Sequence, residues 1–429
     1  MQTTIDALVA DGLKISFPLI RKELEQAQIE RLRRTVEHAR RNSVLYKKRF
    51  KNLDVDSLGG IKDLAMLPFV TSGDIANLGH QLHCVSQSEV ARIITMHTSG
   101  STGKPKRYSF TATDLAATSK FFFHGMASLV GQGDSVLVLL PYETEASVGE
   151  LLISALLAGG IKAQGLWPPL AAARVTELIC KNKITSVVGL PQQLLALSES
   201  VPFGQLKSML LCSDYAPDVL RKRIEQHCGC ETFLHYGATE SGLGGAVECS
   251  EHCGVHIRES DLLIEIIDSR TGQQLSDGVA GEVVLTTLGR EAMPLIRYRT
   301  GDWASLDKRY CKCGGVTARL CNIYGRLNSC QLSDGSVLNS QALDDILFQV
   351  SGLLDYRVTL DNKGVDRLSF EYIATSSAGE VGEKIQQIVN NIPEVSCLLE
   401  SNELRLDNIQ QVESFAPTHT LKRTILDLR

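Results

Sequence analysis

Short apolar, β-prone runs alternate with longer segments of helical periodicity between residues 90 and 245. The runs predict buried strands, and the segments between them predict helices. The expected strands are 135–140, 184–190, 209–213 and 231–236, and the expected helices are 149–158, 171–182 and 217–227. Such alternation is typical of βαβ units around a mainly parallel sheet, where ligands usually bind at the carboxyl ends of the strands. We therefore expect an α/β fold with its site in this region.

The pattern changes twice further along the chain. After residue 254, strands predicted at 262–267 and 281–287 flank a turn, which indicates a small β-rich subdomain attached to the larger sheet. From about residue 327, two predicted strands and a helix at 379–391 form a segment of small-domain size. The sequence thus predicts an N-terminal domain at 1–325 and a smaller α+β domain at 327–429.

Composition narrows the function classes. The net charge of −5 argues against a nucleic-acid binder, which needs clustered Lys and Arg. No apolar run approaches the roughly 18 to 20 residues of a membrane-spanning helix, and the N-terminus lacks the basic and apolar regions of a secretory signal. The twelve cysteines show no compact scaffold pattern, which favours reduced thiols and a cytoplasmic location.

A glycine-rich segment carries the first chemical signal. A β-prone run at 93–96 leads directly into small and hydroxylated residues followed by a lysine: Thr98, Ser99, Gly100, Ser101, Thr102, Gly103 and Lys104. Small residues let the backbone approach a polyphosphate, and Lys104 supplies positive charge. The glycines lie too close for a Walker A loop, and Pro105 stands where that motif needs Ser or Thr. A flexible surface loop is the alternative; we favour a phosphate loop of another kind.

Three shorter motifs follow in the chain. They are His-Tyr-Gly-Ala-Thr-Glu at 235–240, Arg-Tyr-Arg-Thr-Gly-Asp at 297–302 and Gly-Arg at 325–326. Each is weak alone, since Glu240 could cap a helix, Asp302 could close a turn and Arg326 could lie in solvent. With the glycine-rich loop, in this order, they resemble the adenylate-forming superfamily of acyl-CoA synthetases, peptide-synthetase adenylation domains and luciferases. That resemblance implies a large adenylation domain and a small mobile C-terminal domain.

The resemblance also implies roles for individual residues. Tyr236 would pack against adenine, and Gly237 would lie beside it in the nucleotide site. Thr239 and Glu240 would reach the phosphates and Mg²⁺, and Asp302 would bind the ribose. Arg326 would lie at the interdomain hinge near the ribose. The remaining carried-over positions are Ser213 and Asp214 in the adenine loop, where Cys-Ser-Asp-Tyr replaces the usual Gly-Ala-Glu-Pro.

Within the superfamily the chain is most similar to phenylacetate-CoA ligases. The similarity rests on 28–40, Tyr46, 67–69 and 291–300, and on the C-terminal segment 417–423. By that match Lys422 is the mobile lysine that contacts the carboxylate and the α-phosphate. A cation suits this place, because one anion attacks another there.

The resemblance implies two half-reactions. A small carboxylic acid reacts with MgATP to give an acyl-adenylate, and coenzyme A then forms the thioester. Two alternatives stay open. The first is a related enzyme, either an adenylyltransferase acting on a deazaflavin-type cofactor or an enzyme that transfers the acyl group to another acceptor. The second is a non-catalytic nucleotide-binding protein, which is permitted by the altered hinge residue Asn328. No nucleic-acid or membrane partner is expected, and a homodimer is possible.

Two cysteine groups indicate a metal. Cys249 and His256 lie about sixty residues before the pair Cys311 and Cys313. Two thiolates with a Cys/His pair complete a tetrahedral zinc site, and some phenylacetate-CoA ligase relatives resemble this pattern. Cys253 or His252 could substitute as ligands, and reduced cysteines without metal are the alternative.

The acyl pocket is expected near 141–145, 167–169 and 191–193, at the ends of the predicted strands. Glutamates and glutamines in these segments predict a polar pocket. The sequence leaves the acid unnamed, although it disfavours plain phenylacetate.

Overall fold

The structure is a computed structural model that describes residues 2–96, 104–168, 170–326, 329–375, 380–415, 423 and 425–429; of residues 326 and 329 it describes the backbone alone. Several predicted positions therefore lie outside the described residues. They are Thr98 to Gly103, Pro169, Asn328, Lys422 and the side chain of Arg326.

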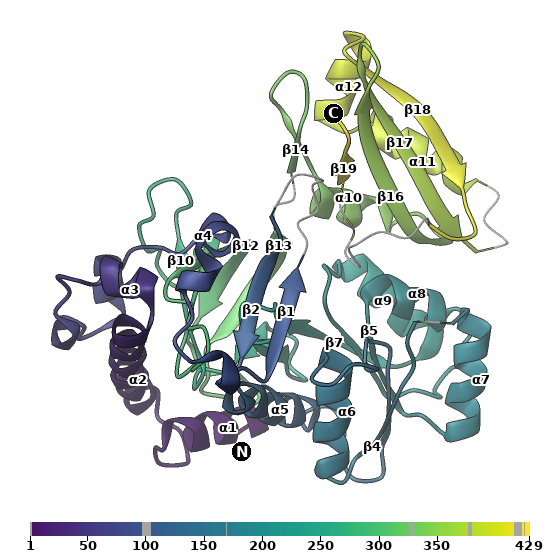
Figure 1. Ribbon diagram of the computed structural model, residues 1–429. Coiled ribbons are helices and arrows are strands. Elements are labelled where there is room, and N and C mark those ends of the chain that lie inside the picture. The colour runs from purple at the N-terminus through teal and green to yellow at the C-terminus, as the bar shows by residue number, and fades with distance from the viewer. Residues whose placement is uncertain are drawn as a thin grey trace.

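One large mixed sheet organises most of the chain (Figure 1). Over the described residues it has eleven strands in the order β10-β11-β12-β13-β9-β8-β7-β6-β5-β3-β4. The parallel strands are β3 (Ser135–Val138), β4 (Lys162–Gly165), β5 (Ser186–Gly189), β6 (Ser208–Leu211) and β7 (Glu231–Tyr236). The antiparallel strands are β8 (Ala246–Glu248), β9 (Val255–Ile257), β10 (Leu262–Ile267), β11 (Gly281–Thr287), β12 (Tyr298–Asp307) and β13 (Arg319–Arg326).

Helices cover both faces of the parallel part. Along β3, Val136 and Val138 pack into one apolar cluster and Leu137 into another, because successive strand residues point to opposite faces. The first cluster includes α5 (Ala112–Met126) and α6 (Val148–Ala158). The second includes α7 (Ala172–Asn182), α8 (Pro191–Ser198) and α9 (Asp218–Cys228). The α/β fold predicted from the sequence is confirmed.

The β-rich segment after residue 254 extends the same sheet instead of forming a separate barrel. Strand β8 pairs antiparallel with β7, with Tyr236 opposite Ala246. The sheet therefore changes from parallel to antiparallel at β7, the strand that carries Tyr236.

The N-terminal part packs beside the antiparallel strands (Figure 1). Its helices are α1 (Thr4–Leu13), α2 (Arg21–Asn42), α3 (Val44–Arg49) and α4 (Ser72–Leu78), with short 3₁₀ turns at Val55–Ser57, Ile61–Met66, Gly79–Gln81 and Gln87–Glu89. A hairpin of β1 (Arg92–Met96) and β2 (Lys106–Phe110) spans the glycine-rich segment. None of the helices in the described ranges is long and apolar enough to cross a membrane.

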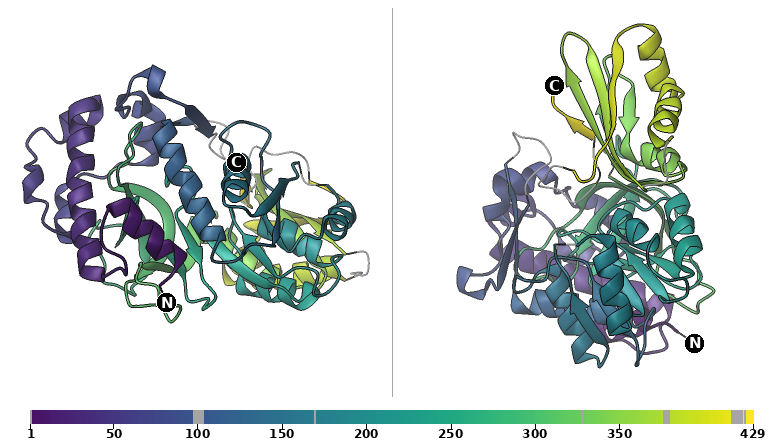
Figure 2. Two further views of the ribbon diagram at one scale, coloured as in Figure 1. Left: turned by 90° about the horizontal axis from the view of Figure 1, so that it is seen from below. Right: turned by 90° about the vertical axis from the view of Figure 1, so that its right-hand side faces the viewer.

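The C-terminal part forms its own sheet, which lies above the rest of the chain in the right-hand view of Figure 2. Its strands are β16 (Leu353–Asn362), β17 (Asp366–Ala374), β18 (Leu404–Gln411) and β19 (Ile425–Asp427), preceded by the hairpin β14 (Ser329–Gln331) and β15 (Val337–Asn339). Its helices are α10 (Ser340–Leu347), α11 (Val381–Asn390) and α12 (Pro393–Glu400). Leu347 and Phe348 join the apolar cluster of α8 and α9, so the two parts are packed against each other. The proposed boundary near residue 326 stays a prediction.

Candidate active site

A cavity of about 110 Å³ lies where the large sheet meets the C-terminal part. Residues from both parts line it, and five of them were singled out from the sequence: Ser213, Asp214, Tyr236, Gly237 and Asp302. They come from the loop after β6, the end of β7 and strand β12. The fold thus brings together positions up to 89 residues apart; their role in nucleotide binding stays a prediction.

Tyr236 and Asp302 form the buried base of this cavity. The Tyr236 hydroxyl donates a hydrogen bond of 2.7 Å to Oδ2 of Asp302. Burial and the neighbouring carboxylate raise the pKa of Tyr236 well above its usual value, so it remains a donor. The Asp302 amide in turn donates to Oγ1 of Thr300 at 2.9 Å. The Tyr236 hydroxyl orients the Asp302 carboxylate, whose oxygens can accept further hydrogen bonds only from donors.

Glu240 links the phosphate-loop hairpin to the Tyr-Gly motif. Its side chain is 1% exposed, and Oε1 accepts hydrogen bonds from Tyr108 (2.8 Å) and Tyr298 (3.1 Å). Lys106 lies 3.7 Å from the same oxygen. Because Lys106 and Tyr108 begin strand β2, these contacts fix the end of the glycine-rich segment against residue 240. Lys104, by contrast, is exposed and its Nζ contacts Oδ1 of Asn77 at 3.3 Å.

Two buried arginines, which were not predicted from the sequence, donate hydrogen bonds to the backbone at and just after the same motif. Arg290 donates to the carbonyl oxygens of Glu240 (2.9 Å) and Thr239 (3.4 Å), and Arg258 donates to those of Ser241 and Gly242. Burial lowers the pKa of both, that of Arg290 to about 10. Their spacing in the sequence gave no signal, because they act through backbone carbonyls and not through a motif.

Arg423 closes the cavity from the C-terminal side. Its guanidinium contacts Asp344 through Nε at 2.9 Å and donates to the Tyr215 carbonyl at 2.7 Å and to Oε1 of Gln192 at 3.0 Å. Its backbone amide donates to Asp214 at 3.0 Å. One residue therefore joins helix α10 to two segments of the large domain. Arg423 directly follows Lys422 in the chain.

A second, smaller cavity adjoins the first. It measures about 50 Å³ and shares Ser213, His235 and Gly237 with the larger one. Its other walls come from α5, α6 and the ends of the parallel strands and are apolar. The expected acyl-pocket segments 141–145, 167–168 and 191–193 are not among the residues that line it.

Comparison with known proteins identifies the family. Residues 14–289 match the model of the AMP-binding enzyme family. The chain belongs to this family. It is 28% identical over 363 residues to a phenylacetate-coenzyme A ligase of Thermus thermophilus, covering 81% of this chain and 80% of the relative. It is 32% identical over 302 residues to a phenylacetate-coenzyme A ligase of Pseudomonas putida, covering 66% of each.

Solved structures show the same fold. A 2-hydroxyisobutyryl-CoA ligase in the postadenylation state, in complex with R3-HIB-AMP, superposes with a TM-score of 0.76 at 18% identity. The match covers 94% of this chain and 90% of that one. The resemblance to adenylate-forming enzymes inferred from the motifs is confirmed.

The cysteine group of this AMP-binding enzyme converges as predicted. The ligand atoms of Cys249, His256, Cys311 and Cys313 all lie within 4.8 Å of one another. The sulfurs of Cys249 and Cys311 are 3.8 Å apart, the separation that a tetrahedron with bonds of ~2.3 Å requires. Nδ1 of His256 contacts Oγ1 of Thr317 at 2.9 Å, which orients Nε2 toward Cys313 at 3.4 Å.

The two substitute ligands differ from this set. His252 contacts Glu231 at 2.8 Å and Glu248 at 3.2 Å, so its ring nitrogens are engaged elsewhere. Cys253 lies 3.4 Å from Cys311, and Arg319 donates to its sulfur at 2.8 Å. The geometry therefore favours Cys249, His256, Cys311 and Cys313 as the metal ligands over His252 and Cys253.

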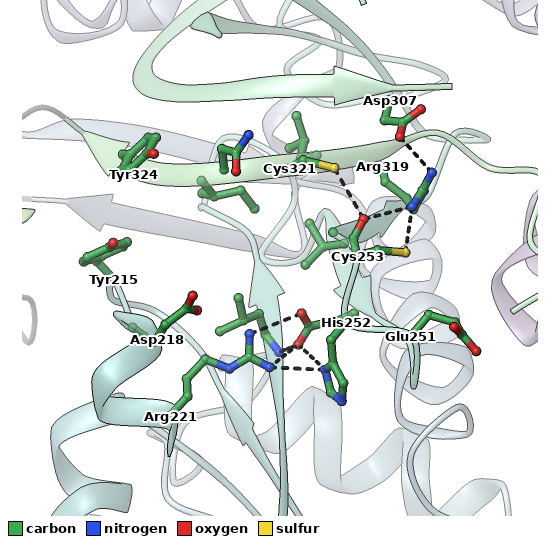
Figure 3. A pocket seen from close by; sticks show the side chains of 18 of the residues that line it. Tyr215, Asp218, Arg221, Glu251, His252, Cys253, Asp307, Arg319, Cys321 and Tyr324 are labelled. Carbon is green, nitrogen blue, oxygen red and sulfur yellow. Dashed lines mark hydrogen bonds and ion pairs between the residues drawn. The ribbon is translucent and has the colours of Figure 1, made fainter. Parts of the chain in front are cut away.

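Another cavity, of about 870 Å³, is lined in part by Cys253, whose sulfur lies 3.4 Å from that of Cys311 (Figure 3). Four of its charged side chains form two ion pairs: Arg221 with Glu248 at 2.8 Å, and Arg319 with Asp307 at 3.0 Å. It also shares Tyr215 and Ala216 with the 110 Å³ cavity that contains Tyr236 and Asp302. Since the family's motif residues gather in the smaller cavities, we assign the chemistry there.

Proposed function

We propose that this protein is an ATP-dependent acid-CoA ligase that works through an acyl-adenylate. The observation that carries the proposal is the junction of the two cavities. A polar cavity with Asp214, Tyr236 and Asp302 meets an apolar cavity along Ser213 and Gly237. A nucleotide and an acyl tail in these places would bring an α-phosphate and a carboxylate together, which is what adenylation requires.

In the first half-reaction the carboxylate oxygen attacks the α-phosphorus, and pyrophosphate leaves. Asp302 accepts hydrogen bonds from the ribose, and Tyr236 provides an aromatic face for adenine. Lys422 neutralises the charge that builds up on the reacting oxygens. In the second half-reaction the thiol of coenzyme A attacks the acyl carbon, the thiol proton is lost to solvent and AMP leaves. Because Arg423 contacts both Asp344 on α10 and Tyr215 of the large domain, these contacts would have to be released for a domain movement between the two steps.

Magnesium enters with ATP, and Glu240 is its proposed protein ligand. The donor type fits, because Mg²⁺ takes oxygen ligands and is often bound through one or two carboxylates and phosphates. Lys106, 3.7 Å from Oε1, competes with the ion for this buried carboxylate and would have to move away from it when magnesium binds. The ion would neutralise phosphate charge during adenylation.

We also propose a structural zinc ion at Cys249, His256, Cys311 and Cys313. Three cysteine sulfurs and one histidine nitrogen are donors that zinc prefers, and all four ligand atoms lie within 4.8 Å of one another. Burial lowers the pKa of His256 to about 4, so its imidazole is neutral and can bind a metal ion. Four protein ligands make a closed site, which stabilises a fold and does no chemistry. The ion would tie the turn before β9 to the loop before β13.

The test measures pyrophosphate release with ATP and a panel of carboxylic acids, with and without coenzyme A. Mass spectrometry of the same reactions detects any acyl-CoA that forms. A ligase releases pyrophosphate with its acid and forms acyl-CoA only when coenzyme A is present. Pyrophosphate without any acyl-CoA would replace the proposal with an adenylyltransferase or another acceptor. No pyrophosphate with any acid would refute it.

A further inference from the structure

Two buried arginine side chains meet beneath the turn at 239–242. Nη2 of Arg258 and Nη2 of Arg290 lie 2.6 Å and 3.7 Å from the position that a Cβ on Gly242 would take. Gly242 has a φ of +82°, and a side chain there would collide with Arg258. Glycine at this position therefore leaves room for two guanidinium groups close to one point.

Neither guanidinium group has a carboxylate as its direct partner. Arg258 is 4% exposed and Arg290 is 7% exposed, and within the described parts of the chain neither forms an ion pair. Arg258 lies 5.2 Å from the ring centroid of Phe121, and its Nε and Nη1 have no hydrogen-bond partner among the described residues. Arg290 lies 4.4 Å from the ring centroid of Phe110. Because arginine stays protonated in proteins, two positive charges are buried here.

This arrangement is unfavourable while the site is empty. Burial removes both charges from water, and the two like charges repel each other. Burial and, less strongly, the charge of Arg258 lower the pKa of Arg290 to about 10, although Asp114 and Glu240 oppose that shift from beyond ion-pair distance. The carboxylate of Glu240 also has Lys106 3.7 Å away. An anion bound on the other side of the turn would reduce the repulsion.

The turn belongs to the motif that we propose binds ATP. Arg290 donates to the carbonyl oxygens of Thr239 and Glu240, and Glu240 is the proposed magnesium ligand. Tyr108, on the hairpin that spans the glycine-rich segment, donates to the Glu240 carboxylate at 2.8 Å. The triphosphate of ATP is therefore the anion that this part of the chain would hold.

We propose that Arg258 and Arg290 form a buried positive charge that attracts the triphosphate of ATP through the turn at 239–242, without direct contact. This inference rests on the proposed ligase activity and adds two positioning residues to its nucleotide site. Charges act over longer distances in a protein interior than in water, because the effective dielectric constant is lower. The contribution of the arginines to affinity should therefore increase with the number of phosphate groups on the ligand.

The test measures equilibrium binding of ATP, ADP, AMP and adenosine, each with magnesium and without acid or coenzyme A. In Arg258→Gln an amide can still donate a hydrogen bond to a backbone carbonyl, but the charge is lost. At an effective dielectric constant of about 20, two unit charges roughly 10 Å apart change a binding constant by about tenfold. Arg258→Gln should therefore weaken ATP binding by about tenfold or more, AMP binding less, and adenosine binding by less than about twofold.

Three further variants separate charge from folding. Arg258→Lys keeps the charge and should retain more of the ATP affinity than Arg258→Gln. Arg290→Gln should show the same dependence on phosphate number, and it replaces Arg258→Gln if circular dichroism shows that the latter is unfolded. Arg223→Gln is the matched control, because Arg223 is half-buried and donates to the backbone carbonyls of Phe348 and Leu353. Any loss of affinity in this control should be equal for ATP and adenosine.

The outcomes separate this inference from the ligase proposal. Unchanged ATP binding in the glutamine variants, equal losses for ATP and adenosine, or a lysine variant as weak as Arg258→Gln would show that the arginines only support the turn. The inference would then be overturned, while pyrophosphate release by the unchanged protein would still support the ligase. If the unchanged protein binds none of the four ligands, both proposals are overturned.

Discussion

Replacing Arg423 with methionine should weaken the contact between the two parts of the chain in a pH-dependent way. The guanidinium is buried and shared between Asp344 on α10 and the Tyr215 carbonyl and Gln192 of the large domain. Methionine has similar length and packs well, so the change removes mainly charge and hydrogen bonds.

The magnitude follows from Asp344, which is 2% exposed. Burial raises its pKa to about 6, and Arg423 opposes that rise. Without Arg423 the folded-state pKa rises further, and the carboxyl takes up a proton. A carboxyl with a raised folded pKa contributes stability at low pH that is lost as pH rises through that pKa. Above pH 6 the variant therefore loses about 1.4 kcal/mol per pH unit relative to the wild type.

Two further contributions act with it. Loss of the hydrogen bonds to Tyr215 and Gln192 costs about 1 kcal/mol each at any pH. Asp355, whose pKa burial raises to about 7 and Arg423 lowers, acts in the same direction as Asp344. The expected destabilisation is thus about 2 kcal/mol at pH 5.5 and about 6 kcal/mol at pH 8, slightly above the roughly 3–5 kcal/mol measured for broken buried ion pairs.

Urea unfolding followed by circular dichroism at pH 5.5 and pH 8 measures this difference, and hydrogen exchange of β16 and β17 reports on the C-terminal sheet. Arg405→Met, at an exposed position on β18, is the matched control and should change little at either pH. An equal loss for Arg423→Met at both pH values would show that the buried carboxylates do not carry the effect.

Three other changes test separate parts of the site. Lys422→Ala should reduce adenylate formation, measured as pyrophosphate release, by about 10²-fold or more. Its affinity for ATP, measured by equilibrium binding, should stay nearly the same. Equal loss of activity and of ATP affinity would contradict the assigned role. Cys311→Ser should abolish bound zinc in metal analysis of the purified protein and lower its Tm, whereas Cys397→Ser, at an exposed position, should do neither. Arg290→Met should lower kcat/KM by about 10–100-fold, because two charge-assisted bonds to the Thr239–Glu240 backbone are lost; unchanged kinetics would show that the motif holds its position without them.

The short motifs made the family predictable from the sequence. Their chemistry is local: a glycine-rich turn, an aromatic beside glycine and a carboxylate after a tight turn are set by neighbouring residues, so their order along the chain carried the inference. Strands such as β7, β10 and β11 were also predicted within their observed bounds, since a buried strand needs only a run of β-prone apolar residues.

Other features depend on residues that the chain brings together from far apart. The sequence predicted a small β-rich subdomain attached to the larger sheet, but it did not show that the attachment is made by pairing of β8 with β7. The segments expected to form a polar acyl pocket do not line the small apolar cavity, whose walls include Phe122 and Leu152, and the place of the acyl pocket stays a prediction. Pairing and packing choices of this kind are made between distant segments, and no local pattern records them.

The sequence by itself determined the family, the alternation of strands and helices and the residue types for nucleotide chemistry. Tertiary structure alone decided that Arg423 joins the two parts, that Arg258 and Arg290 hold the motif backbone, and that Nε2 of His235 is buried without a hydrogen bond to any described residue. The physical reason is that burial, cavity volume and hydrogen-bond satisfaction are properties of assembled surroundings. A residue's identity fixes what it can do, and its neighbours in space decide what it does.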